Sequence, residues 1–170
     1  MGRLEEAFAA HPRAEFLPAD VRARASYDGP LPIAGGQTCS QPRTVADMLE
    51  LLDVRPGQHV LDVGSGSGWT TALLAHLVGP RGRVRGVEVV PELVRVGARN
   101  VAGRHQPWAS VEQAIPGVLG LPEHAPYDRI LVSAEADELP EELRGQLADD
   151  GVMVAPVKGR MLVVTRTDVT

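Results

Sequence analysis

Cysteine, lysine and long apolar runs are scarce in this chain, and each scarcity excludes a class of protein. Cys39 is the only cysteine among 170 residues, so neither an intramolecular disulfide nor a metal site built from cysteines can form. Lys158 is the only lysine, the arginines form no dense cluster, and the net charge is −5, so we expect no nucleic-acid partner. No run of about 18 apolar residues occurs, so we expect no membrane-spanning segment.

The start of the chain and its histidines exclude two further possibilities. The first residues, Met-Gly-Arg-Leu-Glu-Glu-Ala, contain no apolar stretch of the kind that a secretory signal needs, so we expect a cytoplasmic protein. The histidines lack the spacing of metal-binding helices, so we expect no metal site. The length suits one domain with a sizeable core. We expect that domain to span residues 1–170, with an N-terminal helix and loop (1–43) before the core (44–170).

The stretch 59–69, His-Val-Leu-Asp-Val-Gly-Ser-Gly-Ser-Gly-Trp, organises the rest of the chain. Its apolar residues predict a buried strand, and leucines at helical spacing over 70–78 predict a helix after it. Three glycines, Gly64, Gly66 and Gly68, lie between the two, where the absence of Cβ atoms lets backbone approach a ligand. A glycine turn that leads into a helix is where nucleotide-like ligands bind in α/β proteins.

The residues around these glycines distinguish two kinds of cofactor. A dinucleotide site has a third small residue in G-x-G-x-x-G/A, but that position is Trp69 here, which disfavours an NAD-linked enzyme. The actual run, D-V-G-S-G-S-G, resembles the first motif of S-adenosylmethionine-dependent methyltransferases of the Rossmann-like class. Asp62 would attract the positive charges of that cofactor. The alternative is that Asp62 caps the loop and the glycines only form a tight turn.

A second acidic residue follows at a suitable distance. Residues 83–90 alternate like a strand, and Glu88 lies near its end, about 20 residues past the glycine turn. A carboxylate there can accept both ribose hydroxyls of an adenosine. The alternative is an ordinary solvated glutamate at a strand end.

The remaining pattern predicts an α/β fold with a doubly wound, mostly parallel sheet. We expect helices at 4–10, 44–52, 70–78, 91–101 and 140–147, and strands at 60–63, 83–90, 108–113, 130–133, 152–157 and 161–165. Residues 27–42 hold several prolines and glycines, so we expect a loop that is ordered by its contacts and not by regular structure. A loop of this length in a compact domain is usually functional or disordered, and its apolar anchors, Leu31 and Ile33, argue against disorder.

Several motifs together resemble the protein-L-isoaspartate (D-aspartate) O-methyltransferase family. They are Pro-Arg-Ala-Glu-Phe-Leu-Pro (12–18), Leu-Pro-Ile (31–33), Gly-Gln-Thr-Cys-Ser-Gln-Pro (36–42), the glycine motif, Gly-Arg-Val-Arg-Gly-Val-Glu (82–88) and Leu-Pro-Glu-His-Ala-Pro-Tyr-Asp-Arg-Ile (121–130). The resemblance covers most of the chain in the family's order. It implies a Rossmann-like methyltransferase core with an N-terminal helical and loop extension.

The resemblance also implies a reaction. The family transfers a methyl group from S-adenosylmethionine to the α-carboxylate of isoaspartyl residues in damaged proteins or peptides, a repair reaction that leaves S-adenosylhomocysteine. The carboxylate is ionised at neutral pH, so alignment and exclusion of water matter more than a strong base. We therefore expect a peptide or protein partner and a monomer or weak homodimer.

The resemblance assigns roles to individual residues. Ser40 matches the family's active-site serine, Thr38 is a second hydroxyl on the same loop, and Cys39 replaces the usual isoleucine as a small buried residue. The expected cofactor-binding residues are Gln37, Cys39, Asp62, Gly64, Ser65, Gly66, Ser67, Gly68, Glu88, Val89 and Gly117. The alternative for Ser40 is a hydroxyl that only shapes the turn before Gln-Pro.

Three departures from the family pattern carry expectations of their own. Ile115-Pro116-Gly117 replaces a Gly-Asp-Gly near the adenine, and Glu135 interrupts a small apolar stretch near the active site. The sequence ends at Thr170, so the sheet is expected either to lack its last strand and leave an edge open or to receive a strand from another chain at that edge. A catalytically weak or inactive binding module with this fold, and a methyltransferase for another carboxylate, therefore remain open as alternatives.

Overall fold

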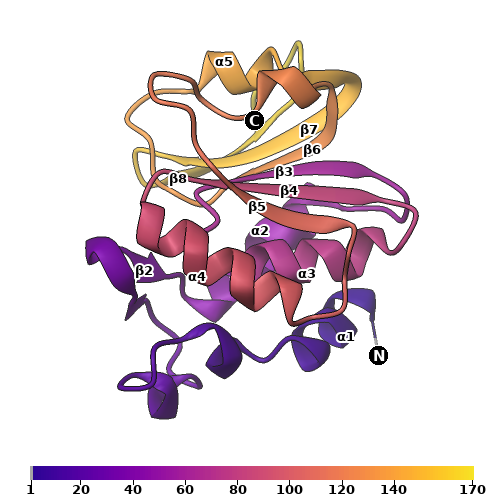
Figure 1. The fold of residues 1–170 in the computed structure, drawn as a ribbon. Coiled ribbons are helices and arrows are strands. Elements are labelled where there is room, and N and C mark those ends of the chain that lie inside the picture. The colour runs from indigo at the N-terminus through magenta and orange to yellow at the C-terminus, as the bar shows by residue number, and fades with distance from the viewer. Residues whose placement is uncertain (1) are drawn as a thin grey trace.

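A six-stranded sheet runs through the middle of the computed structural model, which describes residues 2–170 (Figure 1). The helices are α1 (Arg3–Ala10), α2 (Pro42–Leu52), α3 (Trp69–Val78), α4 (Pro91–Ala102) and α5 (Glu141–Arg144). The strands of this sheet are β3 (His59–Val63), β4 (Arg83–Glu88), β5 (Ala109–Gln113), β6 (Tyr127–Val132), β7 (Leu147–Val157) and β8 (Arg160–Val164). In the part of the chain that the structure describes, no helix has both the length and the apolar composition that a bilayer crossing requires.

The strand order is β5-β4-β3-β6-β7-β8, and every neighbouring pair is parallel except β7 and β8. The mostly parallel α/β sheet predicted from the sequence is therefore confirmed. The chain starts in the centre at β3, moves outward through β4 and β5, and returns to the other side of β3 with β6. This reversal places a crevice at the carboxyl ends of β3 and β6, which is where open α/β sheets bind ligands.

Successive side chains along the strands point to opposite faces of the sheet. Leu61, Ile130 and Met153 pair across β3, β6 and β7 and belong to one core, whereas the neighbouring residues Leu131 and Val154 belong to the other. Helices α1 to α4 cover the second of these cores, below the sheet in Figure 1. The first core is covered by α5 and the 3₁₀ turn Pro122–His124, so this layer is thinner than its counterpart.

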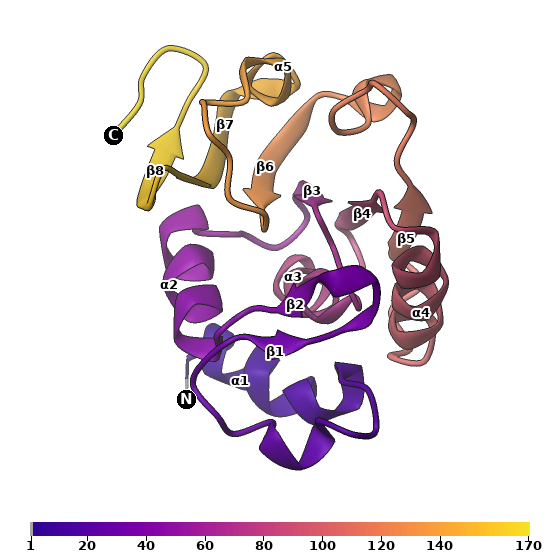
Figure 2. The same cartoon turned by 90° about the vertical axis from the view of Figure 1, so that its left-hand side faces the viewer.

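The N-terminal extension is more regular than its composition predicts. Residues 27–42 contain a small antiparallel hairpin of β1 (Leu31–Pro32) and β2 (Thr38–Cys39), with a 3₁₀ turn at Ala34–Gly36 between them. The expectation of no regular structure in this loop is therefore wrong. Gly35 and Gly36 adopt positive φ angles of 68° and 69°, which allow the tight reversal, while Leu31 is fully buried and anchors the hairpin. In Figure 2 the hairpin lies in front of α3.

The C-terminal part departs from prediction at two places. Only Glu141–Arg144 of the expected helix 140–147 is helical, and Leu147 already belongs to β7. The outer edge of β8 is partly paired by the chain itself, because Val163 and Thr170 exchange backbone hydrogen bonds of 2.7 and 2.8 Å. The edge that was expected to be left open is therefore blunted over its last residues.

Candidate functional site

A cavity of about 560 Å³ lies at the carboxyl ends of β3, β4 and β6, where the strand order reverses. Residues of the glycine turn after β3, of the hairpin β1–β2 and of the segment that follows β5 line it. The predicted site residues that line it are Gln37, Thr38, Cys39, Ser40, Gly64, Ser65, Gly66, Ser67, Glu88 and Val89. Asp62, Gly68 and Gly117 were also predicted but do not line this cavity.

The glycine turn requires glycine for both conformation and space. Gly64, Gly66 and Gly68 have φ angles of 79°, 56° and 92°, a region that other residues rarely adopt. A Cβ on Gly68 would lie 3.0 Å from the carbonyl oxygen of Gly97, so this glycine lets the start of α3 pack against α4. A Cβ on Gly66 would lie 3.4 Å from the side chain of Ile33, another residue that lines the cavity.

Glu88 lies at the end of β4, as predicted, and is 6% exposed. Its Oε2 accepts the N–H of Gly66 at 2.8 Å, and its Oε1 accepts the N–H groups of Val89 at 2.9 Å and Val90 at 3.1 Å. This carboxylate is therefore not a freely solvated side chain. It joins the end of β4 to the glycine turn and lines the cavity beside that turn.

Asp62 is placed differently from the interpretation in which it faces a cofactor. It is fully buried, and its Oδ2 accepts hydrogen bonds from the hydroxyls of Thr70 at 2.6 Å and Thr71 at 2.8 Å. Its Oδ1 accepts a hydrogen bond from Ser133 at 3.2 Å. Burial raises the pKa of the Asp62 carboxyl, and the three hydroxyls oppose that shift. Asp62 thus joins the start of α3 to the end of β6 beneath the cavity.

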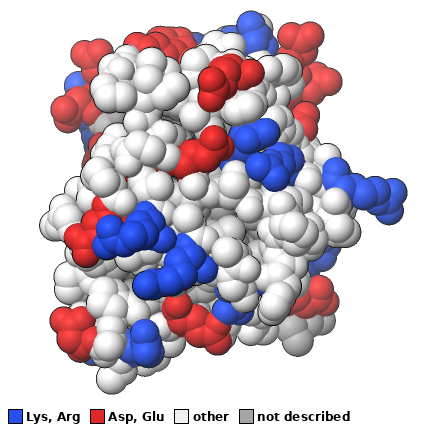
Figure 3. All heavy atoms as spheres, in the orientation of Figure 1, with Lys and Arg blue, Asp and Glu red and all other residues white. Residues whose placement is uncertain are grey.

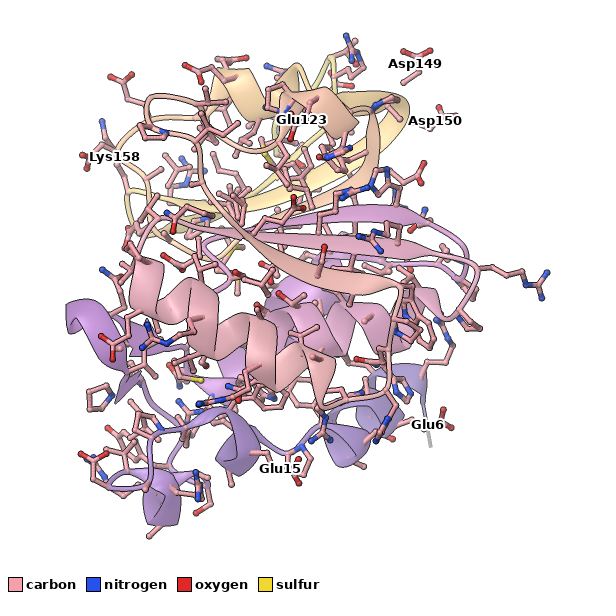
Figure 4. The ribbon with its side chains drawn as sticks, viewed as in Figure 1. Glu6, Glu15, Glu123, Asp149, Asp150 and Lys158 are labelled. Carbon is pink, nitrogen blue, oxygen red and sulfur yellow. The ribbon has the colours of Figure 1, made fainter. Side chains whose placement is uncertain are left out.

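The sequence interpretation singled out Glu135 after β6 but did not include the residues of this segment among the site residues. Ser133, Ala134 and Glu135 line the cavity directly after that strand. The position of Ser133 could have been inferred, because the carboxyl ends of parallel strands share one edge of a sheet. The Glu135 carboxylate accepts the backbone N–H of Gly159, on the turn between β7 and β8. Lys158 on the same turn points outward in Figure 4.

The hairpin β1–β2 brings the predicted loop residues to the cavity. Thr38 and Cys39 form its second strand, Ser40 follows directly after it, and all three residues line the cavity. Cys39 is 6% exposed, and burial raises the pKa of its thiol despite the nearby Arg13 guanidinium, which opposes the shift. A protonated, buried thiol agrees with the interpretation of Cys39 as a small apolar residue and not as a nucleophile.

Gly117 belongs to a turn beside the cavity. Ile115, Pro116, Gly117 and Val118 form a type II turn, in which the N–H of Val118 donates to the carbonyl of Ile115 at 3.0 Å and Gly117 has a φ of 76°. This turn lines a second cavity of about 540 Å³ that shares Val118 and Val89 with the first. Pro116 and Gly117 therefore lie beside the main cavity but not in its wall.

The charged residues that line the cavity are all acidic. Among the residues described around the cavity, Glu88 and Glu135 carry charge, and none is Lys, Arg or His. Among residues 2–170, which the structure describes, no group of three or more His, Cys, Asp or Glu residues is arranged to hold a metal ion. The site therefore suits a ligand that carries positive charge together with hydroxyl groups.

The chain is similar in sequence to proteins of one family. A sequence model of the family described as Protein-L-isoaspartate(D-aspartate) O-methyltransferase (PCMT) matches residues 2–168. The Protein-L-isoaspartate O-methyltransferase of Methanopyrus kandleri is 49% identical over 158 residues, which cover 93% of this chain and 70% of that protein. The protein of the same name from Methanothrix thermoacetophila is 46% identical over 168 residues, covering 96% of this chain and 79% of that protein.

Solved structures share the fold of this chain. A protein-L-isoaspartate O-methyltransferase superposes with a TM-score of 0.81 at 29% identity, covering 96% of this chain but only 54% of that chain. A Plasmodium falciparum beta-aspartate methyltransferase, solved in complex with S-adenosyl-L-homocysteine, superposes with a TM-score of 0.82 at 24% identity, covering 99% of this chain and 84% of that chain. The second likeness concerns the fold alone.

Proposed function

The chain belongs to the protein-L-isoaspartate (D-aspartate) O-methyltransferase family, and we propose that its 560 Å³ cavity binds S-adenosylmethionine and catalyses methyl transfer to the α-carboxylate of isoaspartyl residues. The observation that carries this proposal is the pairing of Glu88 with the glycine turn. It brings a carboxylate and close backbone together at the point where the strand order reverses. The partner is a protein or peptide that contains isoaspartate, and the reaction serves protein repair.

The residues present fit this cofactor. A volume of about 560 Å³ lies within the usual range for sites that bind small molecules. The wall offers two carboxylates and no cation, as a ligand with a sulfonium and an ammonium requires. Ser65 adds a hydroxyl oxygen that is buried without a hydrogen-bond partner among the residues described. We propose that Glu88, whose oxygens already accept three backbone N–H groups, accepts a ribose hydroxyl, and that the glycine turn, with Gln37, Cys39 and Val89, holds the rest.

The reaction requires the protein mainly to align the substrate carboxylate with the methyl group. When bound, S-adenosylmethionine supplies a methyl group already activated by its positive sulfur. The α-carboxylate of the substrate is ionised at neutral pH, so no side chain has to remove a proton from it. The hydroxyl of Ser40, with Thr38 beside it on the hairpin, orients the carboxylate at the cavity mouth. The hairpin excludes water from the reacting atoms.

Calorimetry and a transfer assay together test the proposal. S-Adenosylhomocysteine should bind, NAD should not, and an isoaspartyl peptide should accept a labelled methyl group from S-adenosylmethionine while the matching aspartyl peptide does not. Binding of S-adenosylhomocysteine without turnover on either peptide would favour a binding module with this fold. Pro116 and Glu135, where the family has other residues, motivate that alternative. Turnover on an unrelated carboxylate alone would favour a different carboxyl methyltransferase.

Four further properties complete the proposal. We propose that residues 1–170 act as one domain; Met1 lies outside the described residues, and Ala7, Phe16 and Leu31 of the extension share a core with α2 and α3. A monomer or weak homodimer is supported by the edge of β8, which the chain itself partly pairs.

A free, buried Cys39 suits the reducing cytoplasm. On the face drawn in Figure 3, Arg side chains are interspersed with acids, which disfavours a nucleic-acid track there.

A further inference from the structure

Arg13 is a buried cation whose guanidinium contacts backbone carbonyls and not carboxylates. Its side chain is 5% exposed, and it takes part in none of the ion pairs found among residues 2–170. Its five acceptors are the carbonyl oxygens of Ala25 (3.3 Å), Tyr27 (2.9 Å), Gly29 (2.7 Å), Cys39 (2.9 Å) and Ser40 (2.9 Å). A buried charge is costly unless such dipoles compensate it, so this arrangement constrains the backbone around it.

The five carbonyls belong to both ends of the loop that carries Ser40. Gly29 precedes β1, whereas Cys39 and Ser40 lie at the end of β2, so one guanidinium joins the entry and the exit of the hairpin. The guanidinium carbon also lies 5.7 Å from the ring centroid of Trp69, the first residue of α3 and part of the cavity wall. Arg13 thereby ties the loop to the base of the cofactor cavity.

We propose that Arg13 is a positioning residue for methyl transfer, because its hold on both ends of the hairpin fixes where Ser40 lies relative to the cavity. This inference rests on the proposed function and adds a residue that touches neither cofactor nor substrate. Lysine cannot replace it, since an ammonium offers three donors without the planar fork that reaches several carbonyls at once. A misplacement of about 1 Å can lower a rate by about 100-fold, so a looser hairpin should act mainly on turnover.

The test compares Arg13→Lys with Arg22→Lys. Arg22 is the control because it, like Arg13, donates to backbone carbonyls. Its two acceptors are the carbonyls of Ala14 and Leu17, at 3.2 Å each, and neither belongs to the hairpin. For R13K we expect kcat on an isoaspartyl peptide to fall by about 10- to 100-fold. The Kd of S-adenosylhomocysteine should rise by no more than about threefold, because Glu88 and the glycine turn, which Arg13 does not hold, bind most of the cofactor. Amide hydrogen exchange over residues 37–41 should accelerate in R13K and remain at the wild-type rate in R22K.

Unchanged kcat and unchanged exchange in R13K would overturn the proposal. A loss of kcat that is matched by an equal loss of S-adenosylhomocysteine affinity would also overturn it, since the whole fold would then have loosened. If the wild type has no methyl-transfer activity, the proposed function fails, and faster exchange in R13K would still support the hold on the hairpin.

If R13K does not fold, the wild type provides the test. The Nη signals of Arg13 in a nitrogen NMR spectrum should be slowed and distinct, and they should shift when an isoaspartyl peptide binds. Signals that average freely, or that do not respond to the peptide, would overturn the proposal.

Discussion

The carboxylate of Glu88 accepts the backbone N–H of Gly66 at 2.8 Å and thereby joins the end of β4 to the turn that follows β3. Its two oxygens accept three backbone N–H groups in all. An ionised carboxylate has about four acceptor positions, so the same group can shape the turn and still accept a ligand hydroxyl. Turn geometry and ligand binding therefore depend on one side chain.

Replacement of Glu88 by alanine should weaken S-adenosylhomocysteine binding by about 1.5–3 kcal/mol, because a charged acceptor is lost. Isothermal calorimetry measures the effect directly. Glu92→Ala is the control, since Glu92 is an exposed acidic residue in the first turn of the next helix, α4. If E88A binds as tightly as the wild type, the end of β4 does not hold the ribose.

Replacement of Ser40 by alanine should leave cofactor affinity nearly unchanged and lower methyl transfer to an isoaspartyl peptide. The reason is that the hydroxyl acts on the reacting carboxylate and not on the cofactor. We expect a loss of about 10- to 100-fold in kcat/KM, the range for a misaligned reactant. Ser26→Ala, an exposed serine of the same N-terminal extension, is the control. Wild-type turnover in S40A would reduce Ser40 to a residue that shapes the turn.

Restoring Gly-Asp-Gly at 115–117 should tighten binding of S-adenosylmethionine. Proline at 116 has no N–H and no carboxylate, so one hydrogen bond to the adenine amine, worth about 0.5–1.5 kcal/mol, is missing. The wild type is therefore expected to be weaker than its relatives. The turn lies beside the main cavity. The double variant Ile115→Gly and Pro116→Asp retains Gly117, because its φ of 76° favours glycine. Ile115→Gly alone is the control, and equal affinity of both variants would mean that an aspartate there does not reach the adenine.

Stability should fall in acid because of His11. This side chain is 4% exposed, and Arg104 Nε donates to its Nδ1 at 3.1 Å, so Nδ1 is unprotonated. Burial, with smaller contributions from Arg104 and from His76, lowers the His11 pKa from 6.5 to about 4. A lowered histidine pKa gives a contribution that is complete above pH 6.5 and is lost as the pH falls toward 4.

The free energy of unfolding should therefore drop by up to about 3 kcal/mol over this window through His11 alone. Urea titrations at several pH values measure the drop. His11→Gln should show a shallower decline, because an amide does not titrate, whereas His124→Gln, at a partly exposed histidine, should follow the wild type. Parallel curves for H11Q and the wild type would contradict the assignment.

Local chemistry made much of the fold predictable. A short apolar run predicted β3, an alternating segment predicted β4, leucines at helical spacing predicted α3, and a proline at the first helical position marked the start of α4. Glu88 at a strand end was predicted for the same reason. The helix expected at 140–147 was wrong beyond Arg144, because Leu147 pairs with Tyr127 as the start of β7, and that pairing is a tertiary contact.

The sequence by itself determined the family resemblance, the strand–glycine–helix unit and the acid at the end of β4, because each depends on residues close together in the chain. Only the tertiary structure decided the roles of Asp62 and Arg13. Asp62 is held by Ser133, 71 residues away, and so lies beneath the cavity and not in it. Arg13 reaches Ser40 across 27 residues and meets carbonyl oxygens, which every residue has, so no pattern of side chains marks its partners.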